Sequence, residues 1–244
     1  MNRILAVCCA SLLVLFSALQ PAESASFFED LWQQSQPAPA SPAKQSDTSV
    51  AAGLKEALAI GTENAVKSVG RTDGYFGNQL IRILMPEKMR KVADTLSMIG
   101  YQKEVDEFVL SMNRAAEKAA PQAGAIFADS IRQMTIEDAR KILTGGDTAA
   151  TDFFRAKATG KLTDAFKPIV SRSLDEVGST RSYKNLMQKA DAVPFLKKES
   201  TDLDSYVTGK ALDGLFTVVG QEEKRIRTDP SARVTDLLRS TFGR

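Results

Sequence analysis

Apolar residues recur three and four positions apart along most of this chain, and that spacing predicts amphipathic α-helices. The expected helices cover residues 47–69, 86–100, 102–120, 121–134, 136–144, 147–177, 183–190, 202–219 and 229–238. Residues 79–84 are the one candidate strand, and after the turn-rich stretch 71–78 we expect them to pack as an extended crossover. The pattern therefore predicts an all-α fold, a compact bundle of about eight to ten helices with no significant sheet.

Particular residues mark where several of these helices begin or change direction. Thr135 followed by Asp138 resembles a capping box, in which two residues satisfy each other's backbone N–H groups. Asp147 and Asp202 are expected to cap the helices that follow them. Pro168 lies inside the apolar pattern of its helix, so a kink or a restart is expected there.

A row of small residues follows one face of the first expected helix, and its members are Gly53, Ala57, Gly61 and Ala65. Glycine inside a helix costs about 1 kcal/mol relative to alanine, so two glycines in one row need a structural reason. We expect the backbone of another helix to approach closely along this face.

The first 24 residues have the layout of a secretory signal peptide. Arg3 gives a positive start, residues 4–19 are uncharged and mostly apolar, and small residues precede a cleavage point after Ser24. A retained membrane anchor would need about 20 apolar residues, more than this run supplies. Lipid attachment at Cys8 is disfavoured because Val7 is large where a small residue is required. We expect a periplasmic or secreted protein with no transmembrane segment after cleavage.

Residues 25–46 are expected to form a flexible tether rich in proline, alanine and serine. Its first part, Phe27–Trp32, places four apolar side chains on one face, either as a flap that docks on the body or as a segment presented to a membrane or partner. The remaining residues, 47–244, are enough for one hydrophobic core and are expected to form a single helical domain.

Composition narrows the chemistry that this protein can perform. The chain has no histidine, and its two cysteines, Cys8 and Cys9, both lie in the expected signal peptide. Histidine-dependent triads and ordinary zinc sites are therefore excluded from the exported form, and no cofactor or metal is expected. The formal net charge is only +2, from 32 basic and 30 acidic residues, which does not favour nucleic acid as a partner.

Three polar stretches are candidates for binding a ligand or partner. In the first, Glu117 follows Asn113 by four positions and Arg114 by three, so the three residues share a helix face. They could hold a polar ligand, or they could form an intrahelical ion pair and a helix-to-helix hydrogen bond. The second, Gly145–Thr151, lacks the lysine of a phosphate-binding loop and is interpreted as a tight turn.

The third stretch, Gln221–Pro230, is rich in both charges and is followed by further arginines. Its candidate residues are Glu223, Arg227, Asp229 and Arg233. A solvated face with local ion pairs competes with a functional role. This basic end could also make weak contact with anionic headgroups at a membrane surface.

Four of these motifs, in this order, resemble an uncharacterised exported bacterial family, the domain of unknown function 4197. They are Asp106–Glu117, Gly145–Thr151, Ala211–Phe216 and Glu223–Pro230. The resemblance runs from about Val50 to Phe242 and implies a helical envelope or secreted protein, with no activity, ligand or partner to carry over.

Two functions are consistent with the sequence. The first is a non-enzymatic binding or structural module of the cell envelope, whose partner is an envelope protein or a small polar or lipid ligand held between the Asn113–Glu117 and Arg225–Arg233 segments. The alternative is a hydrolase or lyase that uses two carboxylates on a cell-envelope substrate, because glycoside hydrolysis needs no histidine. No catalytic residue is assigned.

Overall fold

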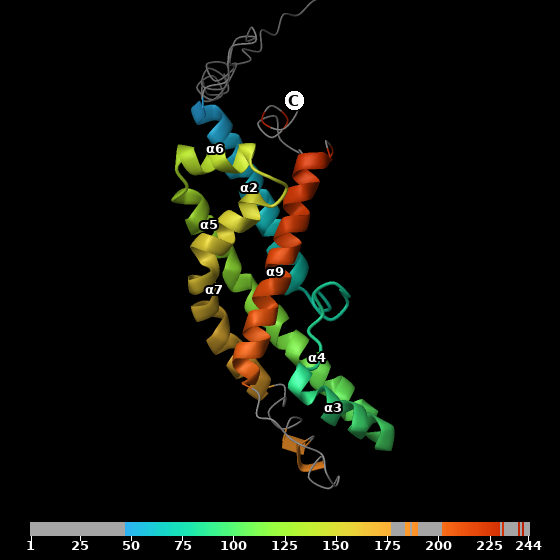
Figure 1. Ribbon diagram of the computed structural model, residues 1–244. Coiled ribbons are helices and arrows are strands. Elements are labelled where there is room, and N and C mark those ends of the chain that lie inside the picture. Colours follow the sequence, from blue (N-terminus) through green and yellow to red (C-terminus); the bar gives the residue numbers. More distant parts are fainter. Residues whose placement is uncertain are drawn as a thin grey trace, which may run out of the picture. The chain divides into compact units, whose positions relative to one another are not determined.

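The fold is given by a computed structural model that describes residues 47–176, 184–185, 187–189, 202–229, 231, 239 and 241. The expected signal peptide and the tether lie outside these residues, as does most of the helix expected after Asp229. Of the helix expected at 183–190, residues 184–185 and 187–189 are described, and they are helical. The described helices are α2 (Asp47–Gly70), α3 (Glu87–Leu96), the π-helix η1 (Ser97–Tyr101), α4 (Gln102–Ala119), the 3₁₀-helix η2 (Ala120–Gln122), α5 (Ala123–Arg132), α6 (Ile136–Thr144), α7 (Ala149–Glu176) and α9 (Leu203–Thr228) (Figure 1).

The all-α prediction is confirmed, since the described residues contain no strand. They contain slightly fewer helices than the eight to ten expected. One reason is that α7 continues through Pro168, where a kink or restart was expected. Pro168 and Asp164, whose carbonyl loses its helical partner, both lie on the exposed face of α7. The opposite face, which includes Phe166 and Val170, is buried and holds the helix together across the proline.

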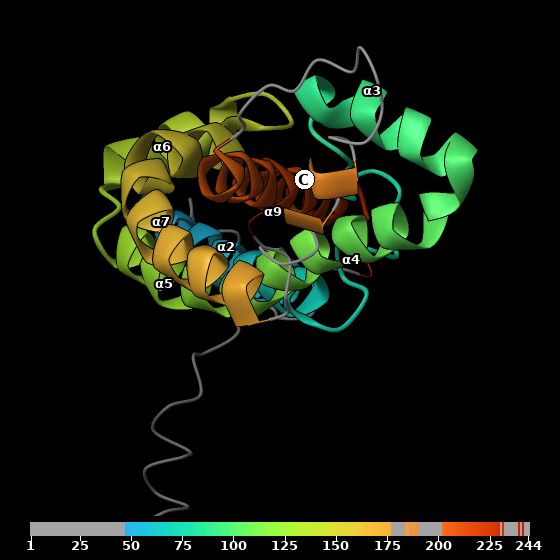
Figure 2. The ribbon, with the colours of Figure 1, turned by 90° about the horizontal axis from the view of Figure 1, so that it is seen from below.

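Helix α9 forms the centre of the core. It packs against α2, α4 and α7, and Figure 2 shows it enclosed by the other helices. Phe216 of α9 meets Phe127 of α5 with ring centroids 6.2 Å apart, and Phe127 meets Phe154 of α7 at 5.1 Å. All three rings are buried, so this aromatic cluster joins three helices.

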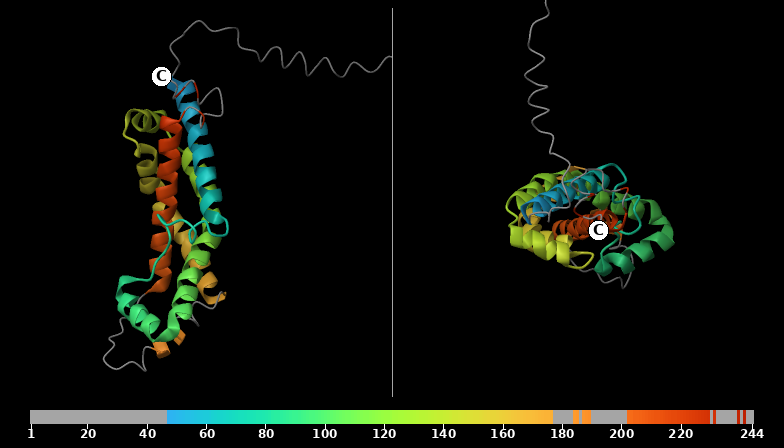
Figure 3. Two further views of the ribbon diagram at one scale, coloured as in Figure 1. Left: turned by 90° about the vertical axis from the view of Figure 1, so that its right-hand side faces the viewer. Right: turned by 90° about the horizontal axis from the view of Figure 1, so that it is seen from above.

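Figure 3 shows α2 and α9 side by side, and the row of small residues on α2 meets α9 at Ala57 and Gly61. Gly53, Ala57, Gly61 and Ala65 are all buried. A Cβ added at Gly61 would lie 3.2 Å from Cδ1 of Ile226, so the close approach predicted here is real. The neighbour is a side chain of α9, where another backbone had been expected.

The capping predictions at two helix starts are confirmed. Thr135 and Asp138 form a full capping box, each accepting a hydrogen bond from the other's backbone N–H. The carboxylate of Asp202 accepts a hydrogen bond from Ser205 N–H at the start of α9. At the turn between α3 and α4, Gly100 adopts a φ of 97°, which favours glycine, and ends the preceding helix as its position in the sequence suggested.

In the part of the chain that the structure describes, none of the helices combines the length and the apolar character that crossing a bilayer requires.

Candidate functional site

The crossover loop, residues 71–86, is the longest described irregular segment, and side chains of α4 hold it in place. Asn113 is completely buried on α4 and makes hydrogen bonds in both directions with Ile83 of the loop. Its Oδ1 accepts from the Ile83 N–H at 2.8 Å, and its Nδ2 donates to the Ile83 carbonyl at 2.8 Å. The amide therefore replaces the backbone partners that an extended segment outside a sheet lacks.

Glu117, one turn further along α4, holds the other half of the crossover loop. Its buried Oε1 accepts hydrogen bonds from the N–H groups of Tyr75 at 3.1 Å and Phe76 at 3.2 Å. Its Oε2 accepts from Arg114 at 2.6 Å, and Arg114 also donates to the exposed carboxylate of Asp73 at 2.8 Å. The hydrogen bond to Glu117 is the largest cause of the raised pKa of Arg114, which keeps the guanidinium charged. We call Asn113, Arg114 and Glu117 the loop clamp.

Tyr75 carries the connection from the loop clamp to α9. Its side chain is fully buried, and its hydroxyl donates to the carbonyl of Ala211 at 2.6 Å. Gly214 makes room for the ring, because a Cβ there would lie 2.7 Å from Cε1 of Tyr75. Burial, and secondarily the charge of Glu117, raises the pKa of the Tyr75 phenol well above its ordinary value of about 10.

A second buried carboxylate, Glu223 of α9, caps the start of α7. It accepts hydrogen bonds from the N–H groups of Ala150 and Thr151, both at 2.9 Å, and from the Thr151 hydroxyl at 2.8 Å. The expectation that Asp147 satisfies these N–H groups was wrong. The cap comes instead from a residue more than seventy positions away. It uses N–H groups that a phosphate would need, which agrees with the interpretation of Gly145–Thr151 as a turn.

Arg227 completes this second arrangement, which we call the helix clamp and define as Glu223 with Arg227. The guanidinium donates to Glu223 from Nε at 3.1 Å and from Nη2 at 2.9 Å, and Nη2 also donates to the Ile142 carbonyl at the end of α6. Asp229 ends α9, and its Oδ1 accepts hydrogen bonds from Ser231. Arg233 lies outside the described residues.

The structure does not bring the two predicted segments into one site. Ala211, which the loop clamp reaches through Tyr75, lies twelve residues before Glu223 on the same helix. At 1.5 Å per residue, that separation is about 18 Å. A hollow of about 650 Å³ does lie over the loop clamp, lined by Arg114, Glu117 and neighbouring residues of α4. Both of these side chains are already hydrogen-bonded within the protein. Their predicted role toward a ligand stays a prediction.

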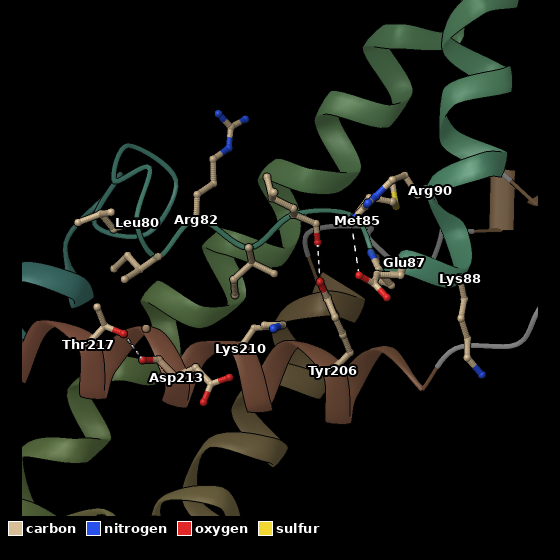
Figure 4. Close-up of a pocket in the computed structure, with 15 residues that line it drawn as sticks. Leu80, Arg82, Met85, Glu87, Lys88, Arg90, Tyr206, Lys210, Asp213 and Thr217 are labelled. Atoms are coloured by element: carbon tan, nitrogen blue, oxygen red, sulfur yellow. Dashed lines mark hydrogen bonds and ion pairs between the residues drawn. The ribbon is translucent and has the colours of Figure 1, made fainter. Parts of the chain in front are cut away.

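A second concavity of similar volume lies between the end of the crossover loop and α9, and we call it the crossover groove (Figure 4). Its volume is about 620 Å³, in the range typical of small-molecule sites. One wall is residues 80–88 with Arg90, and the other is one face of α9. The α9 residues are Tyr206, Lys210, Asp213, Gly214 and Thr217.

The groove wall combines exposed apolar side chains with charged groups. Leu80 is 74% exposed and Leu84 is 59% exposed, which is unusual for leucines next to a closed core. Tyr206 crosses the groove from α9 and donates from its hydroxyl to the Leu84 carbonyl at 3.0 Å. Burial raises the pKa of this phenol, so Tyr206 stays a neutral donor.

Some charged side chains of the groove lie in ion pairs within the described part of the chain, whereas Lys210 does not. Asp213 lies 3.8 Å from Arg155, and Glu87 lies 3.9 Å from Arg90. Lys210 has no ion pair with any described residue, and Figure 4 shows its side chain directed from α9 into the gap beside the crossover loop. The groove therefore presents an amine next to apolar surface.

The sequence did not single out the groove residues. Leu80 and Leu84 belong to the one stretch without helical spacing, which was a usable signal of an unusual segment. Nothing in the sequence indicated that this stretch lies against Lys210 and Tyr206, more than a hundred residues later. The described residues contain no cluster of three metal-binding side chains.

Comparison with known proteins places the chain by family. No curated protein and no solved structure matches it. One family model, described as a protein of unknown function (DUF4197), matches residues 44–243, which include every element of the clamps and the groove. The match covers most of the chain and confirms the resemblance carried by the four motifs. The chain therefore belongs to the DUF4197 family.

Proposed function

We propose that this protein is a non-enzymatic binding module of the bacterial cell envelope and that the crossover groove is its binding surface. The observation that carries the proposal is the groove itself, where exposed Leu80 and Leu84 face α9 across about 620 Å³. Concave sites of this volume that combine apolar walls with a few polar groups are the usual places where proteins bind small molecules.

The state of the buried carboxylates supports binding over catalysis. A general acid or base must be able to exchange a proton with a substrate. In Glu117 and Glu223, by contrast, both carboxylate oxygens accept hydrogen bonds from backbone N–H groups or from arginine. Two carboxylates do line the groove, Glu87 and Asp213, but both are exposed and lie near arginines. Neither has the protected setting that an acid catalyst needs.

The envelope location rests on the sequence of the first 24 residues, with their positive start, apolar run and small residues before Ser24. Sequencing the N-terminus of protein purified from the envelope fraction tests it. A start near Ala25 supports export, whereas a start at Met1 contradicts it.

The binding proposal is tested with N-phenyl-1-naphthylamine, an uncharged apolar dye whose fluorescence rises in apolar sites. We expect saturable binding of one dye per chain. Leu84→Glu places a charge on the groove wall and should reduce this binding at least tenfold, the change that about 1.4 kcal/mol produces. Ile136→Glu is the matched control, because Ile136 is also an exposed aliphatic residue but lies outside the groove. Absent or unsaturable dye binding, or equal loss in both variants, contradicts the proposed function.

A further inference from the structure

We infer that the crossover groove takes a single-chain anionic amphiphile, with the chain on the apolar wall and the anionic headgroup on Lys210. This inference rests on the proposed function and adds the chemical class of the ligand and the residue that selects it. The shared chemistry is a carboxylate or phosphate attached to one alkyl chain, whether from a fatty acid or from a lipid phosphate.

The crossover loop supplies the apolar surface that would contact the alkyl chain. Six consecutive lining residues, 80–85, include five with apolar side chains, and proline follows them. On the α9 side, Gly214 adds no side chain to the groove, because Tyr75 and Ile81 occupy the space that its Cβ would take. An alkyl chain placed here would cover Leu80 and Leu84 and remove their exposed area from water.

The balance of charge around the groove supplies the contact for the headgroup. Four cationic side chains line it, Arg82, Lys88, Arg90 and Lys210, against two carboxylates. The carboxylates lie near arginines, Glu87 near Arg90 and Asp213 near Arg155, so neither neutralises the Lys210 amine within salt-bridge distance. Arg82 stacks on the Phe76 ring at 4.0 Å, and Figure 4 shows it directed away from α9. Lys210 is therefore the cation best placed to meet a headgroup inside the groove.

Other occupants fit the same surface less well. A polyanion such as nucleic acid needs many cations in a row, and this chain carries a net charge of only +2. A cationic or uncharged amphiphile would contact the two leucines but leave the Lys210 amine without a counter-charge. A peptide would occupy the groove without needing a free anionic headgroup, and this occupant is separated from the amphiphile by experiment.

The experiment is displacement of the bound dye by four dodecyl compounds below their micelle concentrations: laurate, dodecyl phosphate, dodecyl maltoside and dodecyltrimethylammonium. We expect at least one of the two anions to displace the dye at a concentration about fivefold or more below that of the uncharged maltoside. One suitably placed lysine contributes this much toward an anionic headgroup. The cationic compound should be the weakest. The better of laurate and dodecyl phosphate indicates which headgroup the groove prefers.

Variants assign the effect to Lys210. Lys210→Gln should reduce the advantage of the anions over the maltoside to less than about twofold, while Lys210→Arg keeps it. Lys224→Gln is the matched control, because Lys224 is an exposed lysine on the same helix outside the groove. These surface substitutions should leave the circular dichroism and the unfolding curve unchanged.

Failure of the inference and failure of the proposed function give different results. If the dye binds in a Leu84-dependent manner but all four compounds compete equally, or if Lys210→Gln has no more effect than Lys224→Gln, the amphiphile inference is wrong while the groove remains a binding surface. Displacement by unstructured apolar peptides at lower concentration than by either anion overturns it in favour of a peptide. If the dye does not bind, both are wrong.

Discussion

The loop clamp and the helix clamp use the same chemical arrangement for different tasks. In each, a buried glutamate lies one helical turn from an arginine and accepts two backbone N–H groups from a distant segment. Glu117 holds an irregular loop, and its arginine is 30% exposed and reaches the surface carboxylate of Asp73. Glu223 caps a long helix, and its arginine is 14% exposed and binds the last turn of α6.

This difference shows which part of the structure each carboxylate stabilises. The helix clamp joins α6, α7 and α9, so its loss affects how three core helices pack. The loop clamp fixes residues 73–83, which lead directly into the wall of the crossover groove. We therefore expect the first to dominate global stability and the second to dominate local order and binding.

The largest effect is expected from Glu223→Ala. It leaves the partly buried Arg227 without its carboxylate and removes the acceptor of the N–H groups of Ala150 and Thr151. Breaking a buried ion pair from one side costs about 3–5 kcal/mol, and we expect the free energy of unfolding to fall by that amount. Urea unfolding followed by circular dichroism measures it. Glu222→Ala is the control, because this neighbour makes only exposed contacts with Arg225 and Asn64 and its removal should cost under about 1 kcal/mol.

Glu117→Ala should lower the free energy of unfolding by a smaller amount, about 2–3 kcal/mol. The reason is that the loop can rearrange toward water when its acceptor is lost. Its distinctive effect is local. Hydrogen exchange at the amides of Tyr75 and Phe76 should accelerate strongly, and dye binding in the groove should weaken. Equal acceleration at Ala150 and Thr151 would mean that the two clamps are not independent, contrary to this account.

How far the sequence anticipates the structure is clearest at these two clamps. Helical spacing correctly placed Asn113, Arg114 and Glu117 on one face, because that geometry is local. It could not identify the partners of Glu117, which lie about forty positions away in a loop. The same limit explains the error at Asp147. A carboxylate next to a helix start is the usual cap, but the packing of α9 brought Glu223 to the N–H groups instead.

Helix ends with local causes were predicted well, such as the capping box at Thr135 and the turn at Gly100. The crossover groove was not predictable, because it exists only where the loop meets α9. The spacing of Leu80 and Leu84 does not indicate whether these leucines are buried or exposed. Only the tertiary structure shows that they line a concavity.

Asn113→Ala separates the amide from the carboxylate within the loop clamp. It leaves both the N–H and the carbonyl of Ile83 without their partner, and we expect a loss of about 2 kcal/mol in the free energy of unfolding. The loss should be accompanied by faster exchange at the Ile83 amide, while Tyr75 and Phe76 change less. Unchanged exchange at Ile83 would show that Asn113 does not hold the groove wall.

Tyr75→Phe tests the link from the loop clamp to α9 and should cost about 1 kcal/mol near neutral pH by removing the hydrogen bond to Ala211. Burial raises the pKa of this phenol in the folded state, so above about pH 10 the unfolded chain releases the proton first. The parent protein then loses stability as the pH rises, and the variant lacks this loss. The difference between the two unfolding free energies should therefore shrink between about pH 8 and pH 11. A constant or growing difference contradicts the assignment.

Asp73→Asn is expected to have the smallest effect, since it removes the charge but keeps a residue type that tolerates the φ of 63° found here. The ion pair with Arg114 is exposed on the Asp73 side, and such pairs contribute less than about 1 kcal/mol. Because Glu117 retains Arg114 and both loop N–H groups, exchange at Tyr75 and Phe76 should stay within about threefold of the parent. A larger change in exchange would show that Asp73 also holds the loop and belongs to the loop clamp.

Hydrogen exchange by mass spectrometry, with and without saturating N-phenyl-1-naphthylamine, tests most directly whether the clamps are structural and the crossover groove is the binding surface. We expect slower exchange in peptides covering residues 80–88 and 206–217. Protection centred on residues 107–118, over the loop clamp, or on residues 142–151, at the helix clamp, would contradict it.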